Sequence, residues 1–172
     1  YNLNAEFDVN ETGALFINPA HGIGTDYAQS GRNGPSIFPA TSLAVRYRHQ
    51  AGEWYGQVAA LDGVPGDPDD PTSNRVKFGA GDGALLAGEV GRAFGGLRAA
   101  VGGWHYTAHF DDVRDVDAGG DPVRRRGASG AYGIVEGPVY AEGDPEQGLA
   151  MFVRAGIADT LRQPADMKGM KI

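Results

Sequence analysis

Apolar and polar residues alternate along several segments of the chain with the two-residue period of a β-strand. The clearest alternation is in Ser42–His49, whose two faces carry Leu43, Val45 and Tyr47 on one side and Ala44, Arg46 and Arg48 on the other. Gln50–Glu53 include a glycine and fit a tight turn, after which Trp54–Leu61 returns with Gln57 on one face and Val58 and Ala60 on the other. Thr41–Leu61 is therefore predicted to form a hairpin with one apolar and one strongly cationic face.

The same alternation predicts three further pairs of strands. They are Asn2–Val9 with Ala14–Asn18, Ala84–Arg92 with Leu97–Thr107, and Ala131–Tyr140 with Leu149–Ala158. Short turns join the partners of each pair, namely Asn10–Gly13, Ala93–Gly96 and Ala141–Gly148, whereas long connections separate the pairs, namely Pro19–Ala40, Asp62–Gly83 and Ala108–Ser129. Short turns at one end of a sheet and long loops at the other are typical of an antiparallel outer-membrane β-barrel. β-Sandwiches do not sort their loops by length so regularly.

The direction of the apolar faces decides the class of protein. In a soluble fold, the face with the arginines would contact water and the other face would contact a core. In a membrane barrel, the apolar face contacts lipid and the arginines line a wet lumen. Both geometries satisfy the alternation, so the pattern alone leaves them open.

The composition of the chain limits the classes of protein to which it can belong. The 172 residues suffice for one domain, and a net charge of −7 argues against a nucleic-acid partner, since phosphate binding needs a positive field. The chain has no cysteine, which removes disulfides, thiol catalysis and cysteine-based zinc sites. No apolar run is long enough for a spanning helix, but a tilted strand crosses a membrane in about 9–11 residues. The 28 glycines disfavour long helices, so an all-β fold is expected.

Six segments resemble the carbohydrate-selective porin family, known as OprB, and occur in that family's order. They are EFDVNETGALFIN, HGIGTDYAQSGRNGPSIFP, LDGVPGDPDDP, GDGALLAGEVG, GGWHYTAHFDD and DPVRRRG. The resemblance implies an outer-membrane barrel of sixteen strands that admits sugars such as glucose by diffusion. With about eight strand candidates, the chain looks like part of such a barrel over residues 1–158. Residues 159–172 are expected to form an atypical tail, because Leu161–Ile172 departs from the family pattern and does not alternate.

The polar face of the predicted barrel combines arginines, carboxylates and aromatic rings. The candidate pore-lining residues are Glu6, Asp8, Arg46, Arg48, Gln57, Glu89, Arg98, Trp104, Tyr106, Glu136 and Arg154. Arginine offers planar donors to sugar hydroxyls, and carboxylates accept hydroxyl protons. An aromatic ring offers a platform for the C–H face of a sugar. For any one of these residues an ordinary lumen charge, paired with its neighbours, is the favoured interpretation. For the set as a whole, the resemblance favours a sugar track.

Three loops carry further candidates. In the first, Gln29, Arg32, Asn33 and Phe38 are expected either to fold inward as a constriction or to belong to an external loop. In the second, Asp67, Asp69 and Asp70 offer oxygen ligands to calcium but lack EF-hand spacing, so no metal is assigned. In the third, Arg124–Arg126 follow several aspartates, which favours mutual pairing or lipopolysaccharide contact. The four histidines form no catalytic motif, and neither an enzyme nor a cofactor is expected.

The leading hypothesis is a passive sugar channel in the bacterial outer membrane. Its expected partners are small glucose-like mono- or oligosaccharides, outer-membrane lipid and lipopolysaccharide, and a homotrimer stays open as its assembly. One alternative is a soluble carbohydrate- or calcium-binding β-sandwich, and another is a barrel anchor with a filled lumen. Trp54 and Tyr47, near the short turn of the hairpin, fit either an aromatic belt at the lipid interface or simple hairpin packing. Burial of Leu43, Val45 and Val153 between two layers would contradict the channel.

Overall fold

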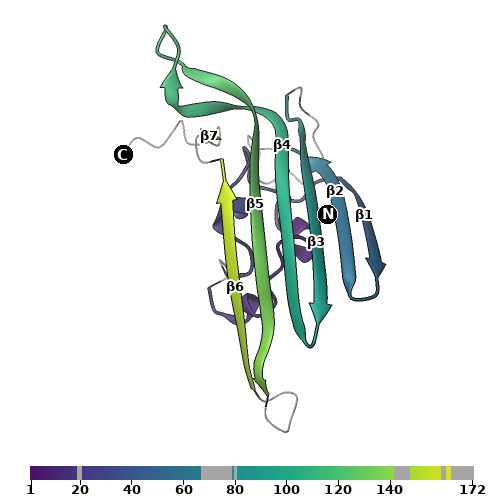
Figure 1. Cartoon of the computed structure of the whole chain (residues 1–172). Coiled ribbons are helices and arrows are strands. Elements are labelled where there is room, and N and C mark those ends of the chain that lie inside the picture. The colour runs from purple at the N-terminus through teal and green to yellow at the C-terminus, as the bar shows by residue number, and fades with distance from the viewer. Residues whose placement is uncertain (19–20, 67–78, 80, 142–147, 160–161, 164–172) are drawn as a thin grey trace.

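The computed structural model of the chain describes residues 1–18, 21–66, 79, 81–141, 148–159 and 162–163 (Figure 1). Within these residues, seven strands form one antiparallel sheet. The strands are β1 (Ala44–Ala51), β2 (Trp54–Asp62), β3 (Ala84–Phe94), β4 (Leu97–Val116), β5 (Pro122–Ala141), β6 (Gly148–Ala158) and β7 (Arg162–Gln163). β1 to β6 follow one another in chain order across the sheet, and β7 pairs with β4. The prediction of an antiparallel all-β fold is confirmed.

Six of the eight predicted strands form, and they correspond to β1–β6. Their registers agree with the predicted hairpins, since Arg48 lies opposite Gln57 and Glu89 lies opposite Gly102. Glycines at positive φ provide the tight turns, for example Gly52 between β1 and β2. β1 and β6 are the two edges of this sheet, and it is open across the described residues.

The prediction of strands at Asn2–Val9 and Ala14–Asn18 is wrong. The chain forms short 3-10 helices there, η1 (Leu3–Ala5) and η2 (Gly13–Leu15). A single α-helical turn, α1 (Thr25–Ala28), follows. We call residues 1–18 and 21–42 the N-terminal segment. It lies across one face of the sheet, behind the strands in the view of Figure 1.

The prediction of a loop at Ala108–Ser129 is also wrong, because β4 and β5 continue as a paired hairpin through most of this range. A register shift between Tyr106 and His109 marks the start of the extension. Asp111 then lies opposite Arg124, and such opposite charges stabilise a strand pair. The extended hairpin projects beyond the rest of the sheet, at the end opposite the short turns (Figure 1).

The apolar faces of the strands point away from the N-terminal segment. The exposed fractions of Leu43, Val45 and Val153 are 57%, 79% and 68%. Because all described strands belong to one sheet, no second sheet within these residues covers that face. The sandwich alternative, which requires these side chains to be buried between two layers, is contradicted.

The hydrophobic core lies on the opposite, inner face, beneath the N-terminal segment. Leu3, Phe7 and Tyr27 of this segment pack against strand residues such as Leu85 and Tyr106, and all five are fully buried. No helix among the described residues is both long and apolar enough to cross a membrane. Two expectations lie largely outside the described residues. They concern the aspartates Asp67, Asp69 and Asp70, and the tail Leu161–Ile172, of which only β7 is described.

Candidate functional site on the inner face

Glu89 is a buried carboxylate that gathers hydrogen bonds from both the sheet and the N-terminal segment. It lies on the inner face of β3 and is 2% exposed. One of its oxygens, Oε2, accepts from the backbone N–H of Asp8 at 3.0 Å and from the Tyr132 hydroxyl at 2.7 Å. The other oxygen accepts from the Tyr55 hydroxyl, the Gln57 amide and the Arg98 guanidinium at 2.8, 3.2 and 3.3 Å. With five donors, this charge is well satisfied although it is removed from water.

Side chains of neighbouring strands also bind the backbone of the N-terminal segment. Arg98 donates to the carbonyl oxygen of Val9 at 2.8 Å and to the Glu136 carboxylate at 2.8 Å. Glu136 in turn accepts from the backbone N–H of Thr12 at 3.0 Å. Because this part of the segment belongs to no sheet, these side chains provide hydrogen-bond partners for its partly buried backbone groups.

Arg154 on β6 connects two parts of the N-terminal segment. Its guanidinium donates two hydrogen bonds to Asp8, at 2.8 and 2.7 Å, and two to Asp26, at 2.7 and 3.1 Å. Burial raises the pKa of the Asp8 carboxyl, and the hydrogen bonds from Arg154 oppose this shift. Gly24 lies directly against the guanidinium, where a Cβ would overlap its atoms. The approach of Arg154 therefore requires glycine at this position.

Aromatic rings fill the space between the segment and the sheet. Tyr27 of α1 stacks on Trp104 of β4, with ring centroids 5.3 Å apart and ring planes 12° apart. Trp104 meets Tyr106 edge to face at 5.9 Å. The rings of Trp104 and Tyr106 are 5% and 0% exposed. Burial also raises the pKa of the Tyr27 hydroxyl, so this group is neutral.

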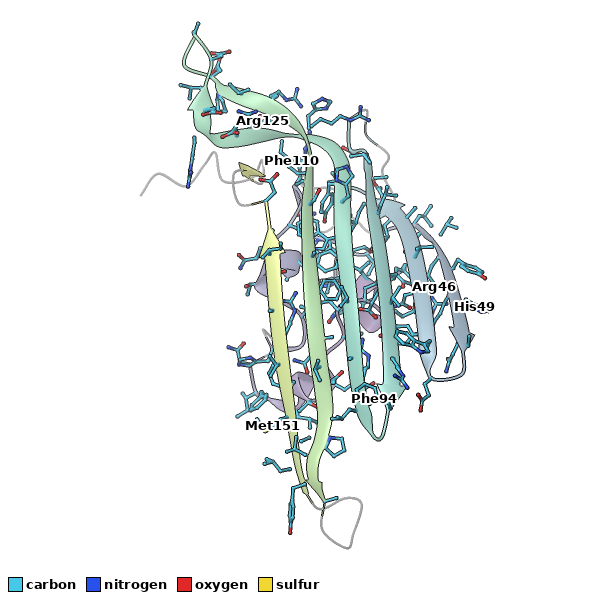
Figure 2. The ribbon with its side chains drawn as sticks, in the orientation of Figure 1. Arg46, His49, Phe94, Phe110, Arg125 and Met151 are labelled. Carbon is cyan, nitrogen blue, oxygen red and sulfur yellow. The ribbon has the colours of Figure 1, made fainter. Side chains whose placement is uncertain are left out.

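The two cationic residues of β1 are more open to solvent. Arg46 forms an ion pair with Glu6 of the N-terminal segment and keeps a side-chain exposure of 31%. Arg48 is exposed, lies over the Tyr55 ring at 4.6 Å and donates to the Gln57 amide oxygen at 3.4 Å. Figure 2 shows Arg46 on β1 at the edge of the sheet.

The residues of the predicted constriction loop differ in exposure. Arg32 donates to the carbonyl oxygen of His109 at 2.9 Å, and Asn33 donates to that of Pro65 at 2.8 Å. Both contacts join the N-terminal segment to the end of the sheet with the long connections. Gln29 is exposed, and Phe38 is 78% exposed. These contacts attach Arg32 and Asn33 to that end of the sheet, and whether the loop narrows a channel stays a prediction.

The predicted lumen residues therefore divide into two sets. Gln57, Glu89, Trp104, Tyr106 and Glu136 are buried beneath the N-terminal segment, together with the Asp8 side chain. Glu6, Arg46, Arg48, Arg98 and Arg154 keep partial or full exposure. Tyr55, Tyr132 and Asp26 complete the network and were not predicted. Tyr55 and Tyr132 have the same strand parity as Gln57 and Glu136, which is the signal that could have placed them. No cluster of three or more histidine or acidic side chains in the described ranges is arranged to hold a metal ion.

The family model of the carbohydrate-selective porin OprB family matches residues 1–168. The chain belongs to this family. The match extends past Ala158, where the resemblance noted in the sequence ends. The fold of the chain is also similar to that of a solved structure, Pseudomonas putida OprB at high pH. The TM-score between the two is 0.76, and their sequences are 21% identical. That similarity covers 94% of this chain and 41% of the other, so the chain spans less than half of that porin's length. No curated protein matches the chain.

Proposed function

We propose that the protein is a passive, sugar-selective channel of the bacterial outer membrane, with this chain as part of its barrel wall. The single observation that carries the proposal is the direction of the two faces. Apolar side chains such as Val45 and Val153 are exposed outward, while the charged network is on the inner face. An outward apolar face suits hydrocarbon, and an inward polar face suits a wet lumen. The family and the similar fold of Pseudomonas putida OprB support this function.

Closure of the barrel requires further strands. An open sheet edge in lipid leaves backbone groups unpaired, and each costs several kcal/mol. We therefore propose that β1 and β6 pair with strands outside the described residues, in a barrel of about sixteen strands that leaves an aqueous channel. In Pseudomonas putida OprB, 59% of the chain lies outside the matched region, since the match covers 41%.

The sugar path in this part of the barrel passes over the N-terminal segment. Gln57, Glu89, Trp104 and Tyr106 lie beneath that segment, so we assign them to holding it in place. Arg46 and Arg48 face solvent beside it and are the better candidates for donating to sugar hydroxyls. Such contacts must be strong enough to favour entry and weak enough to permit exit.

Three further assignments belong to the same proposal. The long-connection end of the sheet faces outward from the cell, as in porins generally. The three arginines of the extended hairpin, Arg124–Arg126, are exposed there and are the candidates for contact with the phosphates of lipopolysaccharide. Within the hairpin Arg124 also pairs with Asp111, and Arg125 pairs with Asp112 and Asp115. A homotrimer stays a proposal for the assembly.

A barrel anchor with a filled lumen is the second candidate, favoured by the burial of one sheet face under the N-terminal segment. The two functions differ in ion conductance, since a filled barrel carries no current through a planar bilayer. Open-channel conductance of the wild-type protein would favour the channel, and its absence would favour the anchor.

The sugar assignment is tested by liposome swelling with the full-length protein. Replacing Arg46 and Arg48 with Ala should change the relative uptake rates of different sugars, because both guanidinium groups face the solvent. Arg92→Ala is the matched control, since Arg92 lies on the outer face of β3, over the rings of Trp54 and Phe94. Heat-modifiable migration in detergent shows whether each variant folds. Identical sugar rates in a folded double variant would contradict the role of the two arginines.

A further inference from the structure

Three aromatic rings gather on the inner face close to the edge strand β6, apart from the residues considered so far. The ring centroids of Phe16 and His21 are 5.3 Å apart, and both rings lie near Phe152, at 6.0 and 6.3 Å. Their planes are inclined by 57° to 64°, so the rings form an open cradle rather than a stack. Phe16 and His21 are exposed, and Phe152 is half-buried.

The cradle faces the inner side of the sheet. Phe152 alternates with Met151 and Val153, whose side chains are 54% and 68% exposed on the outer face. It has the same strand parity as Arg154 and lies opposite Glu136 in the register. Exposed aromatic rings are ordinary on a surface that contacts lipid. On the wall of a water-filled lumen, they suit a ligand with an apolar face.

Buried polar contacts hold the cradle in place. The Asn10 side chain, 1% exposed, donates to the carbonyl oxygen of His21 at 3.0 Å and accepts from the N–H of Gly13 at 2.7 Å. The Thr12 N–H is bound by Glu136. The backbones that carry Phe16 and His21 are therefore fixed to each other and to β5, and such preorganisation reduces the entropy lost on binding.

We propose that Phe16, His21 and Phe152 form a sugar-stacking platform toward the exit of the channel. This inference rests on the proposed channel function. The C–H face of a pyranose lies against the rings, while the imidazole nitrogens and the nearby Arg154–Asp26 pair offer polar partners to its hydroxyls. Met151, adjacent to Phe152, lies in the lower part of β6 in Figure 2, toward the short-turn end. That end faces the periplasm in porins.

The experiment measures sugar-induced block of ion current through the full-length protein in planar bilayers. Phe16→Leu and Phe152→Leu keep an apolar side chain but remove the aromatic face. Their combination should raise the sugar concentration for half-maximal block about threefold to tenfold, with the unblocked conductance nearly unchanged. Phe16→Trp should retain the block. Phe94→Leu, an aromatic residue of the outer face near the same end of the sheet, is the matched control and should leave the block unchanged.

Two results would overturn the platform. An unchanged half-blocking concentration in the double variant would show that the rings do not contact sugar. A lowered unfolding temperature with unchanged block would show that the rings pack against another part of the barrel wall. Failure of the proposed function gives a different result, because the wild-type protein itself would then show neither sugar block nor sugar-dependent liposome swelling.

Discussion

Arg154 and Asp8, separated by 146 positions in the chain, form a two-bond ion pair that attaches the N-terminal segment to an edge strand of the sheet. The exposed fractions of their side chains are 12% and 0%. Removing either partner would leave the other charge buried and unpaired, and an unpaired buried charge is strongly destabilising. We therefore expect the ion pair to hold the N-terminal segment against the inner face of the sheet.

Replacing Arg154 with Ala should lower the free energy of unfolding by about 3–5 kcal/mol, because Asp8 would remain buried and unpaired. Asp26 would also lose its partner. Chemical denaturation of the protein in detergent measures the effect. Arg92→Ala, which removes an exposed pair with Glu53, should cost about 1 kcal/mol or less. Equal losses in the two variants would show that the pair does not hold the segment.

Gly102 on β4 provides room for the ring of Tyr132, which lies over it from the neighbouring strand. A Cβ at position 102 would overlap the ring atoms. Gly102→Ala should therefore displace Tyr132 from Glu89 and destabilise the protein by about 1–3 kcal/mol. At Gly88, on the outer face, an added Cβ would lie 3.9 Å from its nearest neighbours, so Gly88→Ala should be neutral or slightly stabilising. Thermal unfolding of the two variants tests this difference, and a more harmful change at Gly88 would contradict it.

The contact of the outer face with lipid can be tested by placing an arginine at two positions that are expected to lie at different depths relative to the bilayer. Val153→Arg on β6 should cost about 2–4 kcal/mol if the side chain faces the middle of the bilayer. Val116→Arg at the end of the extended hairpin, where the native side chain is similarly exposed at 62%, should cost little because it faces water. Folding into lipid vesicles of defined thickness, followed by denaturant titration, measures both. Equal costs would show that Val153 does not contact lipid.

The strands could be predicted because their inner and outer faces differ in chemistry at every second residue. The N-terminal segment could not, and Leu3 and Phe7 show why. They are four positions apart, a spacing that fits one face of a strand and also one side of a helical turn. In the structure both are fully buried while Ala5 between them is exposed, which is the helical solution. Only the contact with the sheet decides between the two.

The candidate site shows the same limit. Glu89 and Trp104 lie buried on the inner face, and the alternation within their strands carries no signal for the part of the chain that covers them. Their partners come from segments distant in sequence, such as Tyr27 and the Asp8 backbone. The extended hairpin was missed for a different reason. Its aspartates and arginines suggested a loop, although opposite charges on facing strands support pairing.

This chain contains no cysteine, so single cysteines introduced into it can report on their surroundings. They can test which face of the sheet contacts water, which contacts lipid, and whether the core on the inner face is closed. Single-cysteine variants at Arg48, Val153 and Ala108 sample three surroundings, namely the exposed inner edge, the outer face and the buried core. In vesicles, a membrane-impermeant maleimide should label position 48, only a lipid-soluble maleimide should label position 153, and neither should label position 108 until the protein is unfolded. The pattern follows because the reagent must reach the thiol through water or through lipid. Labelling of position 108 in the folded protein would show that the buried core of the inner face opens to the reagent, and water-phase labelling of position 153 would contradict the assignment of the apolar face to lipid.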